Sequence, residues 1–324
     1  MKHQPEDLPR LQALPLDEKI AMSSRLIQVW CDRFGGPDGA YAAFSGGKDS
    51  TVLLDLGRSL YPDLRAVFFN TGLEFPEIVS FVKTIDNVEV IRPKMTFRQV
   101  IEKWGYPAVS KKVAKAVCTI NRCGTNCQTA RYHLEGIRAD GVKVGPRALL
   151  PHRWRHLIGH EVRISPKCCD ELKKRPAAEY EKRTGRVPFI GTMAGESVQR
   201  MEQWVATGCN SFGLAKPSSK PLSFWTEADI WAYIRGANPS GKPIPYSPIY
   251  DMGYDRTGCV FCCFGVHMEY RNHGTHRFLI MERTHPKLHA FCMRPWDEGG
   301  LGIRRVLELM GLPWRNEQMG LFRR

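Results

Sequence analysis

The amino-acid sequence predicts an α/β fold, a doubly wound and mainly parallel sheet, with a basic insertion and a cysteine-rich C-terminal region. Short apolar runs alternate with helical patterns over residues 40–104, and such alternation is typical of parallel βαβ units. A glycine-rich segment lies between the first of these strands and its helix. The length of 324 residues fits an α/β core of roughly 200 to 250 residues with additions.

The predicted elements follow one another in a regular order. An amphipathic helix is predicted at 15–34, as a cap before the core. Apolar runs predict strands at 40–44, 64–70, 88–91 and 187–193, and helical patterns predict helices at 51–60, 75–84, 97–104 and 226–235. Thr226 is the expected N-cap of the last helix.

Three parts of the chain are expected from this order. Residues 110–166 interrupt the alternation with basic, glycine-rich and tryptophan-containing segments, so we interpret them as an insertion or lid. The parts are then a helical cap at 1–36, an α/β domain at 37–265 that includes the insertion, and a helical extension at 266–324.

The composition is that of a soluble globular protein, with 43% hydrophobic and 25% charged residues. The formal net charge is +14, which favours polyanionic partners such as nucleic acid, although a solvated basic surface is the alternative. The basic clusters are 111–115, 152–156, 173–175, 304–305 and 323–324. We expect a cytoplasmic protein without membrane contact, because the sequence has neither a signal peptide nor an apolar run of about 18 residues.

A phosphate-binding loop is predicted between the first strand and its helix. It consists of Ser45, Gly46, Gly47, Lys48, Asp49 and Ser50. Glycines let backbone N–H groups approach an anion, the helix N-terminus adds partial positive charge, and Lys48 can neutralise phosphate oxygens. The spacing is not that of a Walker loop. A flexible Gly-Ser turn, the alternative, would not require Lys-Asp-Ser directly before an apolar helix.

The cysteines form a second pattern. Cys168 and Cys169 are adjacent, and Cys259 and Cys262 form a C-x-x-C pair that begins 259 − 169 = 90 positions later. Four thiolates suit zinc or an iron-sulfur cluster. Adjacent cysteines favour [4Fe-4S], because a cubane offers them separate iron corners. Cys263 could replace Cys262 as a ligand, and buried structural cysteines are the alternative to any metal.

The remaining cysteines and histidines give weaker signals. Cys118, Cys123 and Cys127 suit either a second metal or sulfur site or incidental thiols in a lid. Cys31, Cys209 and Cys292 are expected to be small buried hydrophobes, although Cys292 is also a candidate nucleophile. Five histidines near the C-terminal end lack metal-site spacing and are expected on the surface or in the core: His267, His273, His276, His285 and His289.

The loop Ser45–Ser50 resembles the PP-loop of the adenine-nucleotide α-hydrolase-like superfamily, which has a Rossmann-like fold and includes the N-type ATP pyrophosphatases. Phe68–Glu77 resembles a segment of its phosphoadenosine phosphosulfate (PAPS) reductase branch, and the four cysteines resemble the arrangement in assimilatory adenylylsulfate reductases. The similarity extends from Tyr41 to about Gly265. It implies nucleotide contacts from Thr71, Gly72, Glu74, Glu196, Ser197 and Arg200, while Met193 replaces an arginine of the family's substrate loop.

Two enzymatic functions follow from the resemblance. In the first, the loop and Mg²⁺ bind ATP, an acceptor is adenylated with release of pyrophosphate, and sulfur then displaces AMP. Lys48 would stabilise phosphate charge and Asp49 would hold the metal, with a cysteine desulfurase as sulfur donor and nucleic acid as a candidate acceptor. An intact PP-loop favours this hypothesis, because the reductases usually carry a degenerate one.

The alternative is a phosphoadenylylsulfate or adenylylsulfate reductase, which releases sulfite and AMP or PAP with a thioredoxin-like donor. The family's C-terminal Glu-Cys-Gly-Leu-His motif is missing from the sequence, which counts against the reductase. A nucleotide- and cluster-dependent sensor is a third hypothesis.

Overall fold

The computed structural model describes residues 3–318, and these residues form two compact units. The sheet unit consists of residues 3–70, 74–92 and 176–251. The cysteine unit consists of residues 71–73, 93–175 and 252–318. Each unit is assembled from separate chain segments, and the domain boundaries at residues 36 and 265 stay predictions.

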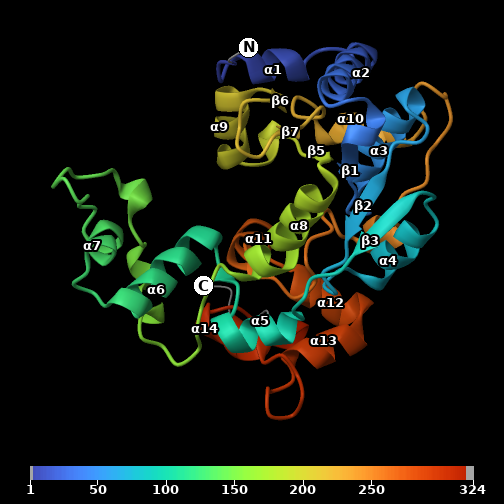
Figure 1. The fold of residues 1–324 in the computed structure, drawn as a ribbon. Coiled ribbons are helices and arrows are strands. Elements are labelled where there is room, and N and C mark those ends of the chain that lie inside the picture. Colours follow the sequence, from blue (N-terminus) through green and yellow to red (C-terminus); the bar gives the residue numbers. More distant parts are fainter. Residues whose placement is uncertain (1–2, 319–324) are drawn as a thin grey trace. The chain divides into compact units, whose positions relative to one another are not determined.

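The sheet unit contains a six-stranded, mainly parallel sheet (Figure 1). In spatial order its strands are β3 (Val88–Ile91), β2 (Ala66–Phe69), β1 (Ala40–Ala43), β5 (Val187–Ile190), β7 (Ser218–Ser219) and β6 (Asn210–Ser211). Every pair is parallel except β6 with β7. This topology confirms the predicted α/β class. The two-residue strands β7 and β6 at one end of this order were not predicted, because two residues are too few to give a hydrophobic period.

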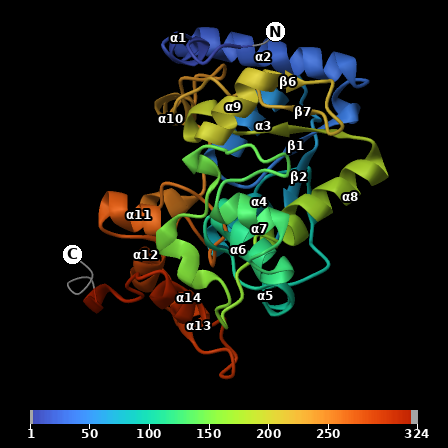
Figure 2. The same ribbon diagram turned by 90° about the vertical axis from the view of Figure 1, so that its left-hand side faces the viewer.

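Helices pack around this sheet. They are α1 (Asp7–Gln12), α2 (Leu16–Arg33), α3 (Lys48–Leu60), α4 (Pro76–Lys83), α8 (Arg175–Thr184), α9 (Val198–Thr207) and α10 (Glu227–Ile234), of which α8 begins at the last residue of a cysteine-unit segment. The predicted cap helix corresponds to α2, which contacts α3 and β7 (Figures 1 and 2). Thr226 caps α10 as predicted, accepting from the Asp229 N–H. One cluster of the core joins Tyr41, Val67 and Tyr180.

The cysteine unit is mostly helical. Its helices are α5 (Phe97–Trp104), α6 (Lys111–Cys123), α7 (Gln128–Leu134), α11 (Val266–His273), α12 (Arg277–Thr284), α13 (Pro286–Met293) and α14 (Ile303–Leu309). A short parallel pair joins β4 (Ala108–Val109) to β8 (Cys263–Phe264). The predicted insertion at 110–166 therefore contributes α6 and α7 to this unit. The predicted C-terminal extension is helical through α11–α14, and its last residues, 319–324, lie outside the described part.

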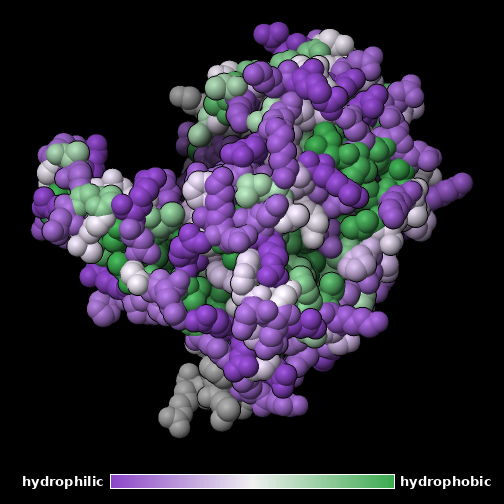
Figure 3. All heavy atoms as spheres, turned by 60° about the horizontal axis from the view of Figure 1, so that its bottom comes forward, coloured by the Kyte–Doolittle hydropathy of each residue, from purple (hydrophilic) through white to green (hydrophobic). Residues whose placement is uncertain are grey.

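The face shown in Figure 3 is hydrophilic over most of its area, and its apolar side chains gather in separate patches. Within residues 3–318 no helix is both long enough and apolar enough to cross a membrane.

Candidate functional site

The predicted phosphate loop connects β1 to α3 and is closed by its own hydroxyl groups. The Ser45 N–H donates to Ser50 Oγ at 3.2 Å, and Ser50 Oγ donates to the Gly47 carbonyl at 2.8 Å. Thr51 Oγ1 donates to the same carbonyl at 3.1 Å. The loop therefore leads directly into the first turn of a 13-residue helix, where backbone N–H groups and the helix dipole favour an anion.

Gly46 shapes this loop. Its φ of +72° lies in the left-handed region, which a residue with a Cβ enters at a cost. A Cβ at Gly46 would lie 2.8 Å from Val82 Cγ2 and 2.9 Å from Ile78 Cγ2, both on α4. The loop backbone thus packs directly against α4, and both the backbone conformation and the close packing require glycine.

Lys48 is held between aromatic rings and a carboxylate. Its side chain is almost fully buried, and its backbone N–H donates to Tyr250 Oη at 2.8 Å. Its Nζ lies 3.2 Å from Glu227 Oε1, 5.1 Å from the Tyr250 ring centroid and 6.0 Å from that of Trp231. Contact between Lys48 and a phosphate stays a prediction, and it would require the ammonium to share its charge with the exposed Glu227 carboxylate.

The loop also lies where the strand order reverses. From β1 the chain proceeds to β2 on one side, while β5 pairs on the other, and open α/β sheets bind ligands at such a point. Gly191 follows β5, and a Cβ there would lie 2.9 Å from the Asp49 carbonyl oxygen. The segments after β1 and β5 therefore meet at the carboxyl edge of the sheet, which supports the predicted location of the nucleotide.

The segment after Gly191 carries three more predicted nucleotide contacts. Glu196 and Arg200 form an ion pair, and Glu196 Oε2 accepts from the Met193 N–H at 2.9 Å. Ser197 caps α9 by accepting from the Arg200 N–H at 3.3 Å. The structure brings these residues together, and their contact with a nucleotide stays a prediction.

The segment after β2 divides between the units. Thr71 is buried in the cysteine unit, where its Oγ1 accepts from the Leu73 N–H at 3.2 Å. Gly72 is exposed with φ +74°, and Glu74 belongs to the sheet unit. A role of these three residues in nucleotide binding stays a prediction.

The four predicted ligand cysteines all belong to the cysteine unit. Burial raises the pKa of the Cys168 thiol, and the proximity of Cys259, Cys169 and Cys262 raises it further. Burial likewise raises the pKa of Cys262 to about 11, although Arg277 opposes that effect. Two segments 90 residues apart in sequence are thus close enough to interact electrostatically. Within residues 3–318, however, no group of three or more His, Cys, Asp or Glu side chains is arranged to hold a metal ion.

The local structure around the vicinal pair is unusual. Residues Asp170–Lys174, directly after Cys169, form a π-helical turn that continues into α8. Single π turns are rare in proteins, and those that occur are often found at functional sites. Glu171 in this turn is buried and pairs with Arg175 at 2.6 Å. The backbone is therefore irregular directly after the cysteine pair.

Arg277 is a residue that the sequence did not single out. Its Nη1 donates to the Cys262 carbonyl at 3.2 Å, and its guanidinium pairs with Glu269. Burial works against its charge, but Glu269 and the nearby thiols of Cys262 and Cys263 raise its pKa overall. A partly buried cation therefore lies beside Cys262, a position that favours the thiolate of that cysteine. One arginine among many in a basic chain carries no sequence signal for this role.

The other cysteines separate into two kinds. Cys31, Cys209, Cys263 and Cys292 are buried, as expected for three of them, and Cys263 lies in β8. Cys123 and Cys127 are joined in a disulfide, which leaves only Cys118 as a free thiol of the trio 118, 123 and 127. The interpretation of these three as a metal site is therefore wrong for this structure, because two of its thiolates are bonded to each other.

The C-terminal histidines are largely structural. His276 and His289 are buried, and their Nε2 atoms lie 2.9 Å from the carbonyl oxygens of Pro313 and Trp314. Burial lowers the pKa of His276 to about 4. These contacts agree with the expectation of core histidines.

A cavity of about 570 Å³ lies in the cysteine unit, apart from the residues predicted for catalysis. Its walls include Tyr106, Arg163 and Trp296, and its charged groups include the ion pairs Arg304–Glu308 and Arg305–Glu161. With its charges balanced in this way, the cavity indicates no particular ligand.

A family model and two named relatives all relate this chain to phosphosulfate reductases. The model of the phosphoadenosine phosphosulfate reductase domain family matches residues 40–264. The adenosine 5'-phosphosulfate reductase of Staphylococcus epidermidis is 26% identical over 219 residues, which is 67% of this chain and 68% of that protein. That of Geobacillus kaustophilus is 26% identical over 237 residues, which is 73% of this chain and 77% of that protein.

Three further similarities are partial or more distant. An uncharacterized protein of Methanocaldococcus jannaschii is 25% identical over 252 residues, and this chain spans only 44% of its length. A second one is 24% identical over 225 residues, and this chain spans 35% of its length. The crystal structure of phosphoadenylyl-sulfate reductase from Candida auris, a phosphate complex, has a TM-score of 0.41 at 15% identity, covering 80% of this chain and 97% of that one.

Proposed function

Since the chain belongs to the phosphoadenosine phosphosulfate reductase domain family, we propose that it is a sulfonucleotide reductase that converts adenosine 5'-phosphosulfate to AMP and sulfite. The observation that carries this proposal is the gathering of Cys168, Cys169, Cys259 and Cys262 in one unit of a chain whose relatives include named adenosine 5'-phosphosulfate reductases. The cleavage consumes two electrons, which a thioredoxin-like dithiol would supply.

The nucleotide would bind at the carboxyl edge of the sheet. The backbone of the loop Ser45–Ser50 and the first turn of α3 offer N–H groups to the phosphate. Lys48 adds a positive charge that Tyr250 and Trp231 shield from water, and an ion pair strengthens as water is excluded. Glu196, Ser197 and Arg200, which follow β5, would close the other side of the nucleotide.

The four cysteines fit a [4Fe-4S] cluster by the chemistry of their donors. Cys₄ is the usual ligand set of such clusters, and ligation requires thiolates. Burial raises the pKa of Cys168 and Cys262, so that without a cation these sulfurs stay protonated. Cys168, Cys169, Cys259 and Cys262 would hold the cluster as thiolates, its positive charge would favour that form, and Arg277 would add to this effect from the Cys262 side.

Iron analysis of the purified protein tests this cofactor. Protein reconstituted under anaerobic conditions should hold four iron and four sulfide per chain and absorb at about 400 nm. Cys168→Ser and Cys259→Ser should lose both signals, while Cys118→Ser, a control in the same unit, should keep them. If the two ligand variants retain iron and colour, the proposed ligand set is wrong.

A second candidate is the ATP-dependent transfer of sulfur, favoured by one observation. Lys48 belongs to a loop with the intact PP-loop motif, and it contacts Glu227, Tyr250 and Trp231. A lysine so placed suits the charge of a triphosphate and of departing pyrophosphate. In this function Asp49 would hold Mg²⁺, the acceptor would be adenylated, and sulfur from a cysteine desulfurase would displace AMP. The net charge of +14 would suit a nucleic-acid acceptor.

One pair of assays separates the candidates. Reconstituted protein is given adenosine 5'-phosphosulfate and thioredoxin with sulfite as the readout, and ATP with Mg²⁺ and bulk tRNA or DNA with pyrophosphate as the readout. Sulfite release supports the reductase, and acceptor-dependent pyrophosphate release supports sulfur transfer. Lys48→Met should reduce either activity, whereas Lys83→Met, an exposed lysine on α4, should not. If protein that holds its full complement of iron releases neither sulfite nor pyrophosphate, both proposals are wrong.

A further inference from the structure

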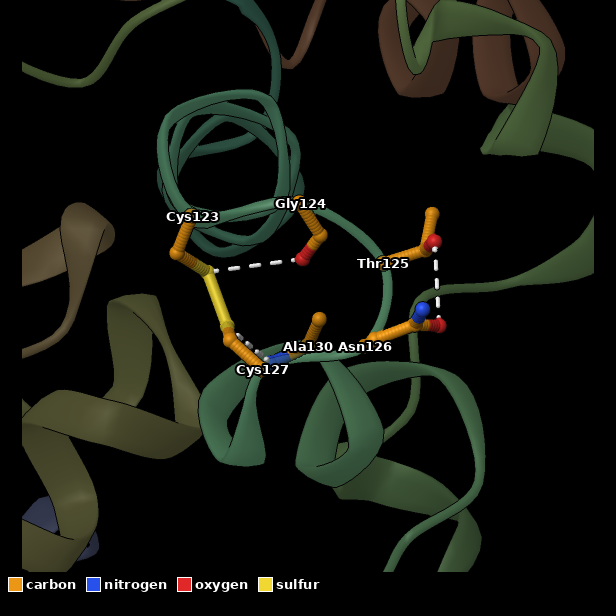
Figure 4. Close-up of a disulfide and its surroundings, with 6 residues drawn as sticks. All are labelled: Cys123, Gly124, Thr125, Asn126, Cys127 and Ala130. Carbon is orange, nitrogen blue, oxygen red and sulfur yellow. Dashed lines mark hydrogen bonds between the residues drawn. A yellow bond between two sulfur atoms is a disulfide. The ribbon is translucent and has the colours of Figure 1, made fainter.

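The disulfide between Cys123 and Cys127 connects two helices of the cysteine unit (Figure 4). Cys123 is the last residue of α6, and Cys127 is the N-cap of α7. The three residues between them, 124–126, are exposed, and the two Cα atoms are 5.9 Å apart. The bond therefore closes a short loop at the protein surface, where an external thiol can reach it.

The two sulfurs are not equivalent. Cys123 is exposed, whereas Cys127 is half-buried. The Ala130 N–H donates to Cys127 Sγ at 3.3 Å (Figure 4). In thiol–disulfide exchange the accessible sulfur is attacked, and the sulfur with the more stable thiolate leaves. Both conditions point to attack on Cys123 and departure of Cys127.

The helices around the pair are basic. Residues 111–134, which span α6 and α7, contain no Asp or Glu and carry Lys111, Lys112, Lys115, Arg122 and Arg131. Arg122 is next to Cys123, whereas the three lysines lie at least two turns away along α6 and Arg131 pairs with Glu135 at 3.3 Å. The same charge would attract a dithiol partner with an acidic surface around its reactive cysteine.

We propose that Cys123 and Cys127 form a redox-active pair that exchanges with an external dithiol, with Cys123 as the sulfur that is attacked. A partner thiolate bonds to Cys123 Sγ, the Cys123–Cys127 bond breaks, and Cys127 leaves as a thiolate that then takes a proton. The partner's second thiolate attacks the mixed disulfide and releases Cys123, which also takes a proton. The pair has gained two electrons, and the partner dithiol has become a disulfide.

The role of this pair in catalysis rests on the proposed reductase function. Reductive cleavage of adenosine 5'-phosphosulfate consumes two electrons per turnover, the number that one Cys123–Cys127 pair carries. In each turnover the thioredoxin-like dithiol would reduce the pair, and the pair would re-form the Cys123–Cys127 disulfide as its two electrons are consumed in the release of sulfite.

Exchange is tested first, without nucleotide. Native oxidised protein is treated with dithiothreitol, quenched with acid, alkylated with N-ethylmaleimide and analysed by peptide mass. Two additional alkyl groups are expected, one on each cysteine of the pair, with the change reversed by oxidised glutathione. A pair that resists native reduction, or that never forms the bond, would overturn the proposal.

The direction of attack is tested with reduced glutathione and a rapid acid quench. The glutathionylated peptide should carry the adduct on Cys123 with about tenfold preference over Cys127, since leaving-group stability and access both favour that route. Equal labelling, or labelling of Cys127, would contradict the assignment of Cys123.

Variants then connect the pair to turnover. With a thioredoxin-like protein as donor, Cys123→Ser and Cys127→Ser should each lower steady-state sulfite release at least about tenfold, because either change abolishes the two-electron pair. Cys118→Ser on the same helix should keep the wild-type rate, and all three should keep their iron content. Wild-type protein that exchanges at Cys123 but forms no sulfite would refute only the reductase. Sulfite release by Cys123→Ser at the wild-type rate would refute the role of the pair as electron entry.

Discussion

Replacing Gly46 by alanine should destabilise the sheet unit by two separable effects. The φ of +72° costs a residue with a Cβ about 1–2 kcal/mol. The new methyl group would also lie 2.8 Å from Val82 Cγ2 and 2.9 Å from Ile78 Cγ2, an overpacking that costs about 1–3 kcal/mol. The expected total is therefore about 2–5 kcal/mol.

Gly35 provides the matched control. It has φ +82° and belongs to the same unit, but a Cβ there would meet nothing within 4 Å. Gly35→Ala should therefore cost only the backbone contribution of about 1–2 kcal/mol. Urea unfolding followed by tryptophan fluorescence measures both variants, and the midpoint should fall by about 1 M for Gly46→Ala and clearly less for Gly35→Ala.

The contact with α4 can be isolated by a double variant. Val82→Ala makes room for the added methyl group, so that Gly46→Ala should cost about 1 kcal/mol less in that background. If Gly46→Ala and Gly35→Ala are equally destabilising, or if Val82→Ala brings no recovery, the loop does not pack against α4 as described. Nucleotide binding gives a second readout, since Gly46→Ala should weaken it and Gly35→Ala should not.

Three further predictions concern buried charge and titration. Burial lowers the pKa of His276 to about 4 from an unfolded value of 6.5, so the unfolded chain binds more protons between these pH values and stability should fall by about 3 kcal/mol as pH drops from 6.5 to 4. Urea midpoints across this range check the loss, and His276→Gln should flatten it. Lys19 is buried with its Nζ 2.7 Å from Asp229 Oδ2, so Lys19→Met should cost about 3–5 kcal/mol by leaving a carboxylate without its cation, a result that a negligible change in midpoint would contradict. Glu227→Gln should tighten binding of a nucleotide by up to about fivefold, because Glu227 shares the charge of Lys48, and calorimetry showing weaker binding would oppose this role.

Local chemistry explains why much of the site could be predicted from sequence. The apolar run before Gly46, the helix after Lys48 and the glycines between them are neighbours in the chain, so one short segment determines both the turn and the anion-binding helix start. The same locality made Thr226 predictable as an N-cap. The spacing of Cys168, Cys169, Cys259 and Cys262 likewise indicated a common site, although spacing alone could not bring the two segments together.

Other features depend on contacts between residues far apart in the chain. Tyr250 reaches the Lys48 N–H across 202 positions, and Arg277, the first residue of α12, reaches the Cys262 carbonyl in the segment before β8. No periodicity or motif marks either side chain, because its role arises only when separate segments pack together. The bond between Cys123 and Cys127 is local in sequence, but a C-x₃-C spacing fits a metal site, free thiols or a disulfide equally well.

The sequence by itself determined the order of the elements from β1 to α5, the position of the phosphate loop between a strand and a helix, and the spacing of the cysteines, since all three follow from residue type and short-range spacing. Only the tertiary structure decided that segments after β1 and β5 meet at the reversal of strand order. It also decided which cysteines are bonded, which are buried and which one lies beside Arg277. The physical reason is that burial, proximity and charge pairing are properties of packed neighbours, and packing selects among the many partners that a sequence permits.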